Sequence, residues 1–222
     1  MSAYAANIGM KAHIFTPSST PENKKNQIKI FGSELHLIDG PRENSTLEVK
    51  KFTKSTGITY LSHNYNPFFI EGMKSFGDEV FNEFGPSITD IVIPVGNGSL
   101  LIGVKKAYED LINLKKIQKI PKIHCVQVEG FSPIVNKINN LNWKFNQNST
   151  TLAGGIAVTN PPRINQAVEA VRNTSGSGVE VSEKEIIGWH RKLAKWGILS
   201  EITCAAAMAG TEQLIDVGIL NK

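Results

Sequence analysis

The chain has 222 residues, of which 41% are hydrophobic and 20% are charged, proportions that are ordinary for a folded globular protein. Its 24 basic residues exceed its 20 acidic residues and give a formal net charge of +4, but they are scattered in pairs and form no long tract. No apolar run is long enough to cross a bilayer. We therefore expect neither nucleic acid nor membrane as a partner.

The two cysteines, Cys125 and Cys204, are too few for a disulfide framework. The first residues also lack the basic start, long apolar core and cleavage site of a secretion signal. These observations predict a reducing, cytoplasmic setting, with both cysteines in packing roles. The histidines show no metal-ligand spacing, so we expect no metal ligand among His13, His36, His63, His124 and His190.

The first third of the chain alternates short apolar runs with helical patterns. Residues 1–9 resemble the end of a helix, since Tyr4 and Ile8 lie one turn apart and Gly9 is a suitable stop. The patterns that follow predict strands at 12–15, 34–38 and 58–62 and helices at 21–31 and 47–56.

The strongest helical pattern spans residues 67–84. Five apolar side chains recur there at helical spacing, with Pro67 at the first turn and Gly85-Pro86 beyond the end. We expect this stripe to face the core; it consists of Phe69, Met73, Phe76, Val80 and Phe84.

The rest of the chain continues the alternation. Patterns predict strands at 91–95 and 123–128, helices at 100–114, 133–138, 164–172 and 183–195, and a polar surface loop at 139–151. Strands separated by helices imply an α/β fold with a doubly wound, mostly parallel sheet. We expect residues 91–95 to form a central strand, because the run is apolar without alternation.

The segment after that strand is rich in small residues and runs directly into a helix. Gly96, Asn97 and Gly98 tolerate positive φ, and Ser99 begins the helix, so backbone N–H groups converge at a helix N-terminus. This arrangement predicts a phosphate site in a concave, backbone-lined pocket. Replacing Gly98 by Val is expected to block phosphate approach and to leave much of the fold intact.

Two other phosphate motifs fail on spacing. A dinucleotide fingerprint needs a third glycine where Leu101 stands. A nucleotide P-loop starting at Gly98 needs a lysine directly after Gly103, where Val104 stands. A single phosphate on a small cofactor fits better, and a tight turn that binds nothing stays open as the alternative.

Several segments resemble, in order and spacing, the fold type II pyridoxal-phosphate-dependent enzymes of the tryptophan synthase β-like superfamily, and in particular the threonine synthase-like branch. Ser2 to Phe15 (SAYAANIGMKAHIF) is similar to the helix and strand that follow the family's Ser-Gly-Asn turn. The other similar segments are 30–40, 66–72 (NPFFIEG), 94–101 (PVGNGSLL), 126–130, 152–163 (LAGGIAVTNPPR) and 197–210.

The resemblance implies a set of residues that hold pyridoxal 5'-phosphate. The phosphate cup would be formed by backbone donors of Gly96, Asn97, Gly98, Ser99 and Leu100. Gly155 would lie beside the cofactor ring, next to Gly154, where many relatives carry an acidic residue. Glu201 would lie near the ring at the start of a stretch in which Ile202 replaces the family's proline.

The resemblance also implies that the Schiff-base lysine precedes the position matching Met1 and that the residue facing the pyridine nitrogen follows Lys222. No catalytic residue is therefore assigned, and this chain alone is expected to be inactive. The expected domains are residues 1–58, the remnant of a smaller mobile domain, and residues 59–222, most of the large cofactor-binding domain.

The implied function is a pyridoxal-phosphate-dependent lyase or synthase that converts O-phosphohomoserine to threonine and phosphate. Two alternatives stay open, a threonine or serine dehydratase and a non-catalytic protein that binds pyridoxal phosphate or phosphate. The expected partners are a small amino-acid substrate and, in the complete enzyme, a second copy of the chain.

Overall fold

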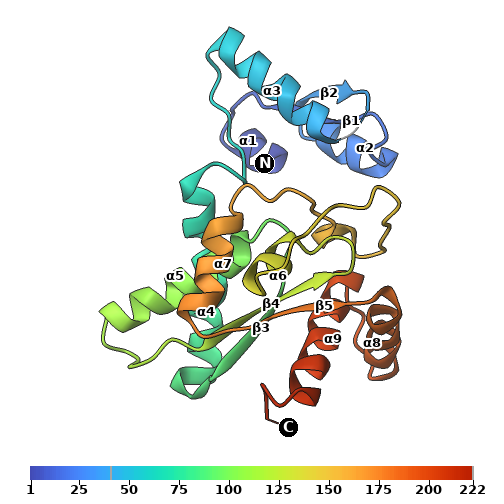
Figure 1. The fold of residues 1–222 in the computed structure, drawn as a ribbon. Helices are drawn as coiled ribbons and strands as arrows, with labels where there is room; N and C mark the ends of the chain where they lie inside the picture. The colour runs from blue at the N-terminus through green and yellow to red at the C-terminus, as the bar shows by residue number, and fades with distance from the viewer. Residues whose placement is uncertain (41, 222) are drawn as a thin grey trace. The chain divides into compact units, whose positions relative to one another are not determined.

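The structure, a computed structural model, describes residues 1–40 and 42–221, with the side chains of residues 42 and 43 left aside. The chain divides into two compact units, Met1–Leu61 and Ser62–Lys222, and each is described by itself. The first unit runs from blue to cyan in Figure 1 and the second from cyan-green to red.

The first unit is a parallel strand pair with helices around it. Strands β1 and β2 are parallel, and helix α2 makes the crossover between them, as a βαβ connection requires. Helix α3 packs on both strands, and its Phe52 ring lies 5.3 Å from the ring of Phe15. The element bounds are α1 Ser2–Asn7, β1 His13–Pro17, α2 Glu22–Ile30, β2 Glu34–Ile38 and α3 Arg42–Thr56.

The strand expected at residues 58–62 is wrong, because this segment forms no strand in the structure. It follows α3 and spans the boundary between the two units at Leu61 and Ser62. A brief apolar run without a neighbouring strand has no partner for its backbone groups, so the pattern alone does not make it part of a sheet.

The second unit is built on a parallel sheet in the strand order β3-β4-β5. The β3 strand is therefore an edge of this sheet and β4 is its centre, so the expectation of a central strand at residues 91–95 is wrong. The element bounds are α4 Pro67–Phe84, η1 Gly85–Ser87, β3 Asp90–Pro94, α5 Ser99–Asn113, β4 Lys122–Val128, α6 Pro133–Ile138, η2 Gly154–Ile156, α7 Ile164–Asn173, β5 Gly178–Val181, α8 Glu183–Lys195 and α9 Ile202–Asp216.

Helices cover both faces of this sheet (Figure 1). The side chains of β4 alternate between two buried clusters: Ile123 and Cys125 belong to the cluster formed with α5 and α7, whereas Val126 and Val128 belong to the cluster formed with α8 and α9. Both faces of the central strand are thus apolar, as in a doubly wound sheet. The expected α/β fold with parallel strands is confirmed.

Helix α4 packs very closely on α5, but only part of the expected stripe, including Met73, lies in this contact. A Cβ atom added at Gly77 would lie 2.7 Å from the Cβ of Ala107, and one added at Gly103 would overlap Met73. The seam also buries Ile70.

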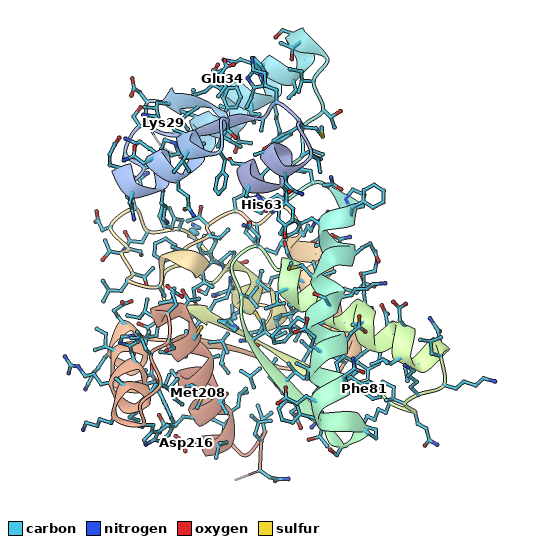
Figure 2. All side chains as sticks on the ribbon, turned by 180° about the vertical axis from the view of Figure 1, so that it is seen from behind. Lys29, Glu34, His63, Phe81, Met208 and Asp216 are labelled. Atoms are coloured by element: carbon cyan, nitrogen blue, oxygen red, sulfur yellow. The ribbon has the colours of Figure 1, made fainter. Side chains whose placement is uncertain are left out.

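The expectation that Phe69, Phe76 and Phe84 belong to the core is wrong, because they are 37%, 44% and 58% exposed. The small residues of the seam allow the two backbones to approach, which turns the phenylalanine stripe away from α5. Phe81, labelled in Figure 2, is partly buried and packs against the core from the same helix.

Within the described residues, every helix is too short or too polar to span a bilayer.

Candidate functional site

The turn from β3 to α5 leaves a row of backbone donors free. Val95 N–H still donates to the Val126 carbonyl, at 2.8 Å, and α5 then begins at Ser99. In the described part of the chain, the N–H groups of residues 96–101 donate to no backbone or side-chain acceptor. Free N–H groups at a helix N-terminus attract anions, since the helix dipole adds partial positive charge.

Gly98 serves the packing of this turn. Its φ of 86° is left-handed. Gly96 and Asn97, which would also tolerate a positive φ, do not adopt one. A Cβ atom there would lie 2.9 Å from the Cβ of Ala167 in α7, so the residue faces the core. The expectation that Val at this position would act by blocking phosphate is therefore wrong: the side chain would first collide with α7 and strain the backbone.

Gln127 holds the end of β3 from the interior. Its side chain is completely buried, and Nε2 donates to the Val95 carbonyl at 3.1 Å. Its Oε1 accepts from the N–H groups of Ile134 and Val135 at 2.8 and 2.9 Å. One amide therefore ties the residue before the glycine loop to the first turn of α6.

A second segment lies directly against the loop. A Cβ atom at Gly96 would lie 3.0 Å from the carbonyl oxygen of Gly155 and 3.2 Å from Cγ2 of Val158. Glycine at position 96 is thus required for the close approach of the two segments. A Cβ at Gly154 would meet nothing within 4 Å, so this position faces open space.

The start of α9 is the third segment of the site, beside the glycine loop and the segment around Gly155. A Cβ atom at Gly155 would lie 3.1 Å from Oγ1 of Thr203. Glu201 is exposed and caps the helix, because its Oε2 accepts from the Thr203 N–H at 2.8 Å. The structure therefore gives Glu201 a local role in shaping this end of α9.

These three segments fit a phosphorylated ligand. The hydroxyl oxygens of Ser99 and Thr203 are buried and have no hydrogen-bond partner among the described residues, which is costly unless a ligand or water satisfies them. The side chain of Leu100 is partly buried against the core, so only its backbone is available to a ligand. Asn97 is partly exposed at the tip of the loop.

A cavity of about 840 Å³ lies at the other end of the sheet. Its lining includes Asp90 and Lys122, the first residues of β3 and β4, and Ile219 near the end of the described chain. The glycine loop is not part of it. A concave pocket at the loop stays a prediction.

Three buried polar groups were missed by the sequence analysis: Gln127, Thr203 and His124. His124 is completely buried; its Nδ1 accepts from Ser177 N–H at 3.1 Å, so Nε2–H donates to Asp90 at 2.9 Å. A polar residue inside an apolar strand run was the available signal for His124 and Gln127.

The two cysteines differ in their surroundings. Cys125 is buried in the core, as expected, and burial raises the pKa of its thiol far above the ordinary value. Cys204 is exposed, so the packing role expected for it is wrong. It lies one residue after Thr203, in the exposed part of the first turn of α9.

A parallel sheet with helices on both faces, and a glycine-rich turn with free N–H groups at the carboxyl end of a strand, define a doubly wound α/β protein. The family model described as pyridoxal-phosphate dependent enzyme matches residues 1–222. The chain belongs to this family of pyridoxal-phosphate-dependent enzymes.

Several relatives that match nearly the whole chain are threonine synthases. The one from Methanosarcina acetivorans is 28% identical over 227 residues, which cover 100% of this chain and 56% of the relative. The one from Bacillus sp. is 30% identical over 222 residues, which cover 99% of this chain and 61% of the relative. The chain thus spans little more than half the length of these curated relatives, and the expected resemblance to threonine synthases is confirmed.

Solved structures agree on the fold. The processed form of threonine deaminase isoform 2 from Solanum lycopersicum gives a TM-score of 0.81 at 20% identity, over 99% of this chain and 58% of that one. An L-serine ammonia-lyase from Rhizomucor miehei gives a TM-score of 0.80 at 19% identity, over 98% of this chain and 68% of that one. At this identity the likeness concerns the fold alone.

Proposed function

We propose that the β3–α5 turn holds the phosphate of pyridoxal 5'-phosphate and that the protein carrying this chain makes threonine and phosphate from O-phosphohomoserine. The observation that carries the first part is the run of free N–H groups at residues 96–101. The second part rests on the threonine synthase relatives, which match the chain from end to end.

In this proposal the chain's own groups bind and orient. The N–H groups of residues 96–100 and the hydroxyl of Ser99 donate to the phosphate oxygens, while the backbone at Gly155, with no side chain in the way, lies beside the ring. Glu201 orders the start of α9 at the edge of the site. Pyridoxal phosphate, when bound, supplies an electron sink for chemistry at the amino-acid substrate.

A threonine or serine dehydratase is the second candidate function, since it would use the same phosphate site. The threonine synthases among the relatives, at 26 to 30% identity, favour the first. We further infer that residues 1–58 come from a smaller mobile domain and residues 59–222 from the large one, and that the enzyme is a cytoplasmic homodimer.

The phosphate site is tested with an isosteric change of charge. Asn97→Asp places a carboxylate beside the proposed phosphate without changing the size of the side chain. We expect the affinity for pyridoxal phosphate, measured by fluorescence titration, to fall about tenfold or more, since like charges repel at short range. Asn113→Asp, at the exposed last turn of α5, the helix that follows the loop, is the matched control and should leave the affinity unchanged.

Titration with pyridoxal, which has no phosphate, separates the phosphate cup from the rest of the site. The affinity for pyridoxal should respond little to Asn97→Asp. An equal loss for both compounds, or none for either, would place the phosphate elsewhere.

The activity is assayed on the product of the complete gene that encodes this chain. We expect release of threonine and inorganic phosphate from O-phosphohomoserine, followed by chromatography and a phosphate assay. Formation of a 2-oxo acid and ammonia from threonine or serine, without phosphate release, would assign the dehydratase instead. Binding of the cofactor with neither reaction would support the non-catalytic alternative.

A further inference from the structure

Three side chains able to bind a metal ion lie together on the paired strands of the first unit. The parallel register sets His13 of β1 opposite Glu34 of β2, and His36 is two residues further along β2. Since side chains alternate along a strand, Glu34 and His36 project from the same face. None of these three residues is among those proposed to bind the cofactor, so the group does not depend on the proposed function. Glu34 is labelled in Figure 2.

The distances within this group match those around one metal ion. His13 Nδ1 lies 3.1 Å from His36 Nε2. The two carboxylate oxygens of Glu34 lie 3.6 Å from His13 Nδ1 and 3.4 Å from His36 Nε2. Ligand atoms of a tetrahedral zinc ion stand roughly 3.3 to 3.6 Å apart, given bonds of roughly 2.0 to 2.2 Å.

The surroundings hold the two imidazoles in place. The His36 ring stacks on Phe15 at a centroid distance of 4.3 Å, and the Phe52 ring of α3 lies 4.8 Å from the His13 ring. The histidine side chains are only 12% and 25% exposed, whereas Glu34 is 47% exposed. The site is thus ordered on its aromatic side and open to solvent at the carboxylate.

The charge of the site favours a cation. Glu34 supplies a carboxylate, and the two imidazoles each offer a ring nitrogen as a ligand atom. Lys11 lies 3.0 Å from one carboxylate oxygen and competes with a metal ion for it. The hydrogen bond between the two imidazoles already directs a ring nitrogen of each toward the other.

We propose that His13, Glu34 and His36 bind a divalent transition-metal ion of the Zn²⁺ type. Two imidazole nitrogens and a carboxylate form a common ligand set for Zn²⁺ and leave a position for water. Each imidazole binds through the nitrogen that now faces its partner, and its proton resides on the other ring nitrogen. Because the ligands come from both strands, the ion links β1 to β2. Spacing along the sequence gave no sign of this site, because His13 and His36 are 23 residues apart and meet only through strand pairing.

The test is a calorimetric titration of Zn²⁺ into the untagged 222-residue chain. We expect one ion per chain, and a rise in the unfolding temperature with added Zn²⁺, because the ion binds the folded strands. His36→Gln and Glu34→Gln should each weaken binding about tenfold or more, since even outer partners of metal ligands contribute that much. His190→Gln, the same change in the second unit, should leave binding unchanged and is the matched control.

A further variant should change the Zn²⁺ affinity in the opposite direction. Lys11→Ala removes the competing cation and should tighten Zn²⁺ binding, a result that a merely structural role of the cluster would not produce. Circular dichroism without metal shows whether each variant keeps its fold, and the exposed Glu34→Gln keeps the test available if a histidine variant unfolds. Equal Zn²⁺ affinity of the unmodified chain, His36→Gln and Glu34→Gln, or no saturable binding, would overturn the proposal.

Discussion

The side-chain amide of Gln127 donates to the carbonyl of Val95 at 3.1 Å, from a completely buried position in the central strand. Val95 is the last residue before the glycine loop, so this bond fixes the point at which the chain leaves the sheet. The same amide accepts from two N–H groups of α6. Gln127 is therefore a positioning residue for the proposed phosphate site.

Replacing Gln127 by Met keeps the size of the side chain and removes its hydrogen bonds. We expect the free energy of unfolding, measured by urea denaturation, to fall by about 2 to 5 kcal/mol, because buried backbone groups lose their partners. The affinity for pyridoxal phosphate should fall as well. Gln118→Met, at an exposed position, is the control. An unchanged free energy in both variants would show that water replaces the amide.

Much of the fold follows from local pattern. The helix at 67–84 and the strand at 34–38 have the predicted bounds, since proline and glycine mark the ends of the first and an Asp-Gly turn ends the second. The β3–α5 turn was also predicted, because an apolar strand pattern runs into a glycine-rich segment at 96–99 and then into a helical pattern. These features depend on neighbouring residues in the sequence.

Other features depend on contacts that local pattern does not contain. Helix α9 was missed because its alanine-rich sequence has little amphipathic contrast, with Ala205 and Ala209 buried between larger residues of other elements. Strand β5 has four residues, too few for a periodic signal. The edge position of β3 is set by strand pairing, which the run of apolar residues does not specify.

The two faces of α4 should respond differently to mutation. Ile70→Ala removes a side chain that is 3% exposed and should lower the free energy of unfolding by about 2 to 5 kcal/mol, through lost burial and a cavity. Phe76→Ser changes an exposed side chain and should cost about 0.5 kcal/mol or less. Chemical denaturation measures both. A large loss for Phe76→Ser would mean that a partner or another segment covers this face.

The pair of Asp90 and His124 predicts an acid-dependent loss of stability. Burial raises the pKa of Asp90, but hydrogen bonds from His124 and Thr89 and the charge of Lys122 outweigh it, so the pKa lies below its ordinary value of 3.8. A lowered pKa means that the ionised carboxylate stabilises the folded state. This contribution is present above the ordinary pKa and is lost as the pH falls through the folded value.

Asp90→Asn should therefore flatten the fall in stability below about pH 4, where the aspartate of the unmodified chain takes up its proton. The measurement is the free energy of unfolding in urea at a series of pH values. Asp78→Asn, on the exposed side of α4, is the control and should leave the slope as it is. Identical slopes for all three chains would show that Asp90 has the same pKa folded and unfolded.

Alanine substitutions at glycines of the second unit should distinguish the stability cost of backbone strain from the cost of a steric collision. Gly197 has a φ of 78° and open space around its Cβ position, whereas Gly98 has a φ of 86° and the Cβ of Ala167 at 2.9 Å. Gly197→Ala should cost about 1 kcal/mol through its backbone alone. Gly98→Ala should cost about 2 kcal/mol or more, because a collision with α7 adds to the same strain.

Gly154→Ala completes the series, because Gly154 has neither a positive φ nor an atom within 4 Å of its Cβ position. Its stability in urea should match that of the unmodified chain within about 0.5 kcal/mol. The order of the three losses is the decisive result. Should Gly98→Ala cost no more than Gly197→Ala, α7 must yield to the new methyl group, and Gly98 would then be required only for the left-handed turn into α5.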